Sequence, residues 1–63
     1  MFIVTELKTG RKTRTNDIND LADIVIGITG APEDGWAAVR VAGNMKWGDK
    51  ADDGEVYSIE CVK

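Results

Sequence analysis

Residues 15–30 read TNDINDLADIVIGITG, and this stretch decides the fold of the 63-residue chain. It opens with Thr, Asn and Asp, the residue types that cap the N-termini of helices. The apolar residues that follow at helical spacing, all on one face, are Ile18, Leu21, Ala22, Val25 and Ile28. Gly30 suits the left-handed position after a helix, and Pro32 cannot continue one. The stretch therefore predicts an amphipathic helix that ends near Gly30.

Two further apolar residues, Ile24 and Ile26, broaden the apolar face of this helix. They widen it to about 200°, more than a core-facing helix normally buries. Either other parts of the fold cover these side chains, or they contact another chain. Residues 24–28 are also β-branched enough to form a buried strand, so the last turn of the helix remains open to that alternative.

The sequence before the helix predicts a β-hairpin with a basic tip. Met1–Leu7 is rich in residues that favour strands, and Arg11–Thr15 can pair back on it as a second strand. Between the two, Gly10 supplies the positive φ that a tight turn requires. The tip holds four of the eight basic residues of the chain, namely Lys8, Arg11, Lys12 and Arg14.

The sequence after the helix predicts further strands. Trp36–Ala42 and Met45–Trp47 are interpreted as strands joined by a turn at residues 43–44, Gly48–Gly54 as a loop, and Glu55–Val62 as the closing strand. The residues of the closing strand expected to share one face are Tyr57, Ile59 and Cys61.

An alternative for residues 36–42 is a helix that begins at Pro32, because Trp36, Val39 and Ala42 would then share a face. Gly35 argues against this alternative, as does the Gly-Asn pair at residues 43–44.

The expected fold is a single small α+β domain spanning residues 1–63. It is an antiparallel sheet of about four strands with one helix packed on one face, in the order β-β-α-β-β-β or β-α-β-β. With 43% hydrophobic and 30% charged residues, the composition is that of a globular chain rather than a disordered one. A single cysteine, Cys61, and the lack of a secretion signal or a long apolar run favour the cytoplasm.

Composition also narrows the chemistry. The chain has no histidine and one cysteine, and it lacks the glycine-rich motifs that cradle phosphates. We therefore expect no enzymatic activity and no catalytic, cofactor-binding or metal-binding residues.

The basic tip is the first candidate contact site, for an acidic partner or for phosphates. Lys8, Arg11, Lys12 and Arg14 are suited to both. A net charge of −3 and the absence of an aromatic residue within the basic run weaken the nucleic-acid interpretation. A solvated hairpin tip without a partner is the third interpretation.

Residues 49–60 follow the spacing of an EF-hand calcium loop, from Asp49 to Glu60. They depart from it at Ala51, where the motif needs a side-chain oxygen, and residues 61–63 favour a strand over an exit helix. Calcium binding is therefore not expected.

The two tryptophans, Trp36 and Trp47, are candidate interface aromatics. At least one of them is expected to be buried in the monomer, since large rings usually fill the core of a small protein. Taken together, the sequence favours a small cytoplasmic protein-binding or regulatory module that acts on a protein partner or on a second copy of itself. The alternative is a nucleic-acid-binding domain that uses the Lys8–Arg14 ribbon. No membrane contact is expected.

Overall fold

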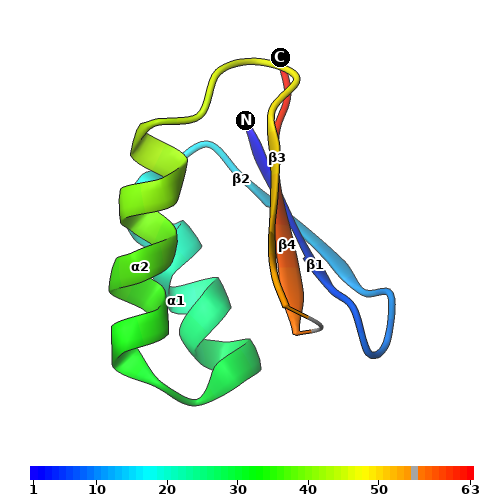
Figure 1. Ribbon diagram of the computed structural model, residues 1–63, viewed down its shortest axis with the longest axis vertical. Coiled ribbons are helices and arrows are strands. Elements are labelled where there is room, and N and C mark those ends of the chain that lie inside the picture. The colour runs from blue at the N-terminus through cyan, green and yellow to red at the C-terminus, as the bar shows by residue number, and fades with distance from the viewer. Residues whose placement is uncertain (55) are drawn as a thin grey trace.

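The chain forms a four-stranded antiparallel sheet with two helices on one of its faces (Figure 1). The computed structural model describes residues 1–54 and 56–63, and of Asp53 the backbone alone. Its elements in chain order are β1 (Phe2–Glu6), β2 (Lys12–Thr15), α1 (Ile18–Thr29), α2 (Pro32–Gly43), β3 (Lys50–Asp53) and β4 (Tyr57–Cys61). The prediction of an α+β fold is confirmed, and the prediction of a single helix is wrong.

The strands lie in the order β2-β1-β4-β3, so the two central strands come from opposite ends of the chain. β1 pairs with β4 from Phe2 opposite Cys61 to Glu6 opposite Tyr57. Beyond these strands the amino group of Met1 donates to the carbonyl of Val62 at 2.8 Å. The two hairpins, β1–β2 and β3–β4, are thus joined along their inner strands, which leaves β2 and β3 as the edges.

The β1–β2 hairpin confirms the predicted strands and turn. Gly10 has a φ of 76°, the left-handed conformation expected of it. Its N–H donates to the carbonyl of Glu6 at 2.7 Å, and the N–H of Glu6 donates to the carbonyl of Arg11 at 2.8 Å. A glycine in this conformation closes the hairpin without the steric cost that a side chain would bring.

α1 occupies the predicted residues, so the strand alternative for residues 24–28 is wrong. Its N-cap is Asp17, whose side chain accepts a hydrogen bond of 2.8 Å from the N–H of Asn19. At the other end Gly30 is left-handed, with a φ of 75°, and its N–H donates to the carbonyl of Ile26. The helix therefore begins at the capping residue and ends at the glycine that the sequence indicated.

α2 overturns the predicted strand Trp36–Ala42 and confirms the alternative of a helix from Pro32. The predicted strand Met45–Trp47 is also wrong, because these residues lie in the connection between α2 and β3. Pro32 stands in the first turn, where its missing N–H is not needed, and acidic residues at 33 and 34 complement the helix dipole. Gly35, which argued against a helix, is a contact point between the helices. A Cβ placed on it would lie 2.6 Å from Cγ1 of Ile26 in α1.

The predicted loop Gly48–Gly54 is wrong in part, because β3 begins at Lys50. Two hydrogen bonds lead into β3: the N–H of Gly48 donates to the carbonyl of Cys61 at 2.8 Å, and the N–H of Cys61 donates to the carbonyl of Asp49 at 2.9 Å. Backbone pairing thus forms a strand from a polar segment that has little β propensity of its own.

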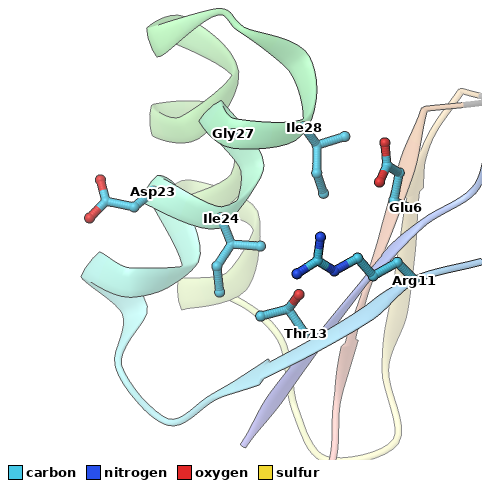
Figure 2. A pocket seen from close by; sticks show the side chains of 7 residues that line it. All are labelled: Glu6, Arg11, Thr13, Asp23, Ile24, Gly27 and Ile28. Carbon is cyan, nitrogen blue, oxygen red and sulfur yellow. The ribbon is translucent and has the colours of Figure 1, made fainter. Parts of the chain in front are cut away.

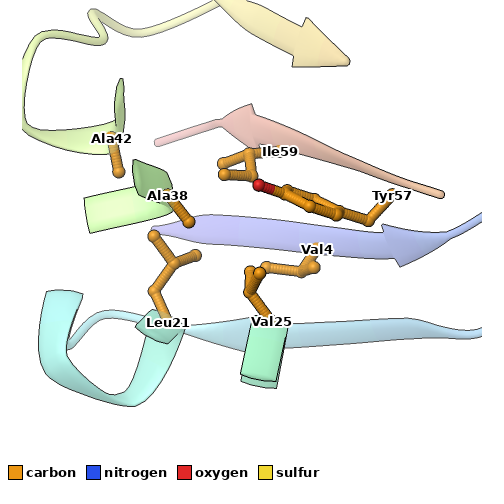
Figure 3. Close-up of a cluster of buried hydrophobic side chains, with 7 residues drawn as sticks. All are labelled: Val4, Leu21, Val25, Ala38, Ala42, Tyr57 and Ile59. Atoms are coloured by element: carbon orange, nitrogen blue, oxygen red, sulfur yellow. The ribbon is translucent and has the colours of Figure 1, made fainter. Parts of the chain in front are cut away.

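The core lies between the helices and the sheet (Figure 3). Its buried members are Val4, Leu21, Val25, Ala38, Ala42, Tyr57 and Ile59. The predicted inward face of the closing strand is confirmed, since Cys61 is buried as well. The broad apolar face of α1 has a cause within the chain, because Ile26 is covered by α2 and Ile24 packs against the core.

Candidate functional site

α2 presents large apolar side chains to solvent on the side away from α1. Its inner face consists of small buried residues, Gly35, Ala38 and Ala42, which let the two helices approach closely. Trp36 is 68% exposed and Val41 is 42% exposed. Ala37 and Arg40 are exposed beside them, so these positions form a stripe at helical spacing. We call Trp36, Ala37, Arg40 and Val41 the outer stripe of α2.

Trp47 is also exposed, at 69%, in the segment between α2 and β3. The Lys63 ammonium lies 4.8 Å from the centroid of its ring, a cation–π contact near the end of the chain. The expectation that at least one tryptophan is buried is therefore wrong. For Trp36 the physical reason is that α2 packs through glycine and alanine, which leaves no inner position for an indole.

The structure distributes the basic tip over different surfaces. Lys12 lies opposite Thr5 and Arg14 opposite Ile3, on the face of the sheet away from the helices. Arg11 instead extends toward α1 (Figure 2). Lys8 is exposed in the turn. The four residues therefore form no single basic surface.

A cavity of about 260 Å³ lies between the β1–β2 hairpin and α1. It is lined by Glu6, Arg11, Thr13, Asp23, Ile24, Gly27 and Ile28. Figure 2 shows Ile24 and Ile28 pointing toward the hairpin, while the side chains of Arg11 and Thr13 extend into the space between the hairpin and α1; Asp23 points away. Of these residues only Arg11 is among the predicted contacts. The sequence held one sign of this cavity, because Gly27 is a glycine inside a helical pattern and lies at the cavity wall.

The calcium-loop spacing falls on a β-hairpin. The Asp49 carboxylate accepts a 2.8 Å hydrogen bond from the N–H of Lys46, whereas Glu60 stands opposite Lys50 on the sheet. Within residues 1–54 and 56–63, no three His, Cys, Asp or Glu side chains gather where they could hold a metal ion. Two positions of the calcium-loop segment, Glu55 and the side chain of Asp53, lie outside the described residues. The calcium expectation stays a prediction.

Searches of family models, curated proteins and solved structures gave no match to this chain. In the part of the chain that the structure describes, no helix is long and apolar enough to span a membrane. The function is therefore inferred from the surfaces just described.

Proposed function

We propose that this chain is a small cytoplasmic protein-binding module, without enzymatic activity, that docks a partner protein on the outer stripe of α2. The observation that carries the proposal is Trp36, which is 68% exposed on that stripe. An indole in water contributes little to the stability of the monomer, yet it supplies a large apolar surface to a partner.

The neighbours of Trp36 fit the same role. Tryptophan and arginine are the residue types most enriched among the residues that dominate binding energy at protein interfaces. Trp36 and Arg40 lie one helical turn apart and are both exposed, with Val41 beside them. The matching partner surface is an apolar hollow that accepts the indole, with a carboxylate placed to receive the Arg40 guanidinium.

A protein partner is favoured over nucleic acid by the placement of charge. Lys12 and Arg14 share the face of the sheet away from the helices, whereas Arg11 extends toward α1, and the chain carries a net charge of −3. Nucleic-acid binding along one ribbon needs several cations on a common surface. A labelled duplex at low salt is the direct control. Tight binding that is lost in the triple variant R11E/K12E/R14E would replace the present proposal with the nucleic-acid alternative.

The two tryptophans allow the outer stripe to be tested by fluorescence. In Trp47→Phe the remaining indole reports on Trp36, and in Trp36→Phe it reports on Trp47. A partner captured from host lysate at stringent salt is identified, purified and titrated into both variants. We expect a blue shift for Trp36, and a loss of affinity of at least tenfold in Trp36→Ala. A partner that binds Trp36→Ala as tightly as the original chain overturns the proposal.

Self-association through the same stripe is the second form of the proposal. Sedimentation of the original chain over a range of concentrations would then show a dimer, and Trp36→Glu would show a monomer. Trp47→Glu is the matched control, since it places the same charge at a tryptophan outside the stripe and should leave the dimer intact.

A further inference from the structure

We propose that the outer edge of β2 and the cavity beside it bind an extended strand of a partner protein, with side chains that alternate acidic, apolar and acidic. This second binding site lies on the hairpin and α1, so it does not depend on the outer stripe of α2. It uses three features of the structure: a free sheet edge, a cavity next to that edge and a separation of charge between the two faces of the sheet.

The edge is the first feature. β2 is the last strand of the sheet, and among the described residues its one neighbouring strand is β1. The N–H of Glu6 donates to the carbonyl of Arg11, so the backbone groups of Glu6 that face β2 are in step with those of Val4, two residues earlier. Val4 lies opposite Thr13, and the alternation of an antiparallel ladder therefore places Thr13 in a hydrogen-bonded pair. The same alternation turns the N–H and C=O groups of Lys12 and Arg14 outward. These groups are where an additional strand would form its backbone hydrogen bonds.

The cavity is the second feature, and it lies where the added strand would place a side chain. Thr13 lines it from β2, and Ile24 and Ile28 form its apolar wall on α1. The partner residue opposite Thr13 would point to the helix side of the sheet, into this space. Pockets for small molecules usually measure about 300–1,000 Å³. A cavity of about 260 Å³ is thus better suited to one apolar side chain than to a whole cofactor.

Gly27 gives independent support. It lies inside α1, where alanine would form a more stable helix. A Cβ built on it would meet no atom within 4 Å, so no contact within the described chain requires a glycine there. Since Gly27 lines the cavity, its missing side chain enlarges the space available to an incoming residue.

The charges on the two faces of the sheet determine which residues should flank the apolar residue of the partner strand. The partner residues on either side of the apolar one would lie next to Lys12 and Arg14, on the face of the sheet away from the helices. Acidic side chains complement both. On the helix side, Glu6 lines the cavity, and its carboxylate disfavours an acid at the central position. Arg11 lies at the same cavity, and its guanidinium has no hydrogen-bond or ion-pair partner among the described residues, so it is free to bond the partner strand.

The test uses capped nine-residue peptides titrated into the ¹⁵N-labelled chain. The first peptide has Glu-Leu-Glu at its centre, flanked by threonines. The controls have Lys-Leu-Lys or Glu-Ser-Glu at the centre, and one carries Glu-Leu-Glu with methylated backbone nitrogens along one edge. We expect saturable shifts at residues 12–15 and 24–28 with the first peptide, and binding at least fivefold weaker with each control. Equal binding of all peptides, or no shifts with the first, overturns the proposal.

Two sets of variants of the chain separate the contributions. Arg14→Pro and Arg14→Ala both remove the charge, but only Arg14→Pro also removes the outward N–H. The Arg14→Pro variant should therefore bind the first peptide at least fivefold more weakly than the Arg14→Ala variant. An edge strand tolerates proline where its N–H faces outward. Gly27→Ala should bind at least threefold more weakly than the original chain, while Trp36→Ala should bind unchanged. Gly27→Ala binding at full strength would exclude the cavity, and a loss in Trp36→Ala would mean that this site is not separate from α2.

A second copy of the chain is the competing occupant of the edge. Its own β3, the opposite edge of the sheet, has an alanine between charged residues in the sequence Lys50–Asp53. Association of copies that is detected by sedimentation and abolished by Arg14→Pro would show that the edge is already used by the chain itself, and it would overturn the proposal.

Discussion

The two helices each contain an internal glycine, and the two glycines have opposite surroundings. A Cβ on Gly35 of α2 would lie 2.6 Å from Cγ1 of Ile26 and 3.0 Å from the carbonyl oxygen of Ala22. A Cβ on Gly27 of α1 would meet nothing within 4 Å among the residues that the structure describes. Gly35 is therefore required by the packing of the monomer. Gly27 weakens its own helix and has no such reason, which indicates a role at the surface.

The largest expected effect is that of Gly35→Ala. The added methyl group would push against Ile26 and the backbone of α1, and overpacking of this kind costs about 1–3 kcal/mol. We expect a clear fall in the free energy of unfolding, measured by urea denaturation. This loss is large for a domain of 63 residues, because small domains have little stability to spare.

The contact partner supplies the control for this prediction. Ile26→Ala in the Gly35→Ala background removes the side chain that the new methyl group would meet. The double variant should lose less stability than the sum of the two single variants, since contacting residues are not additive. An unchanged or increased stability of Gly35→Ala would mean that the helices are not in close contact at this glycine.

The two helices also differ in how their N-termini are capped. α1 is capped by the side chain of Asp17, whereas the N-cap of α2 is Ala31, which makes no side-chain hydrogen bond. Asp17→Ala should therefore lower stability by about 1 kcal/mol, the usual contribution of such a cap. Urea denaturation measures the loss. Asp17→Asn keeps an acceptor at the same position and should restore most of the stability; an equal loss in both variants would contradict the capping explanation.

The same contrast explains how much of the fold could be predicted from the sequence. α1 has a side-chain cap, an apolar periodicity and a terminal glycine, all of which are local signals. The helix was predicted from them, with only its last turn left open to a strand. α2 has Pro32 at its start, but its packing face is Gly35, Ala38 and Ala42. Small residues give little hydrophobic periodicity, and their role depends on α1 lying against them. Tertiary contact therefore decided this segment over local propensity.

The candidate site was predictable to a similar degree. Trp36 and Arg11 were both identified as contact residues from their types. Their exposure and their neighbours depend on the second helix and on the direction of side chains in the hairpin. β3 was missed for a related reason, because Lys50–Asp53 forms a strand only through pairing with β4. The cavity between the hairpin and α1 arises from residues that are distant in the sequence, and Gly27 was its only local sign.

The smallest expected effect, and the one of opposite sign, is that of Gly27→Ala. Alanine is favoured over glycine inside a helix by about 0.5–1 kcal/mol, and the new methyl group meets no neighbour. We expect the free energy of unfolding to rise by about that amount in urea denaturation. Gly27 lines the cavity whereas Gly35 packs on Ile26, so we expect the double variant to show the sum of the two single effects. A loss of stability in Gly27→Ala would mean that this glycine has a structural role like that of Gly35. A gain accompanied by weaker peptide binding would show that the chain gives up helix stability at this position to keep the cavity open.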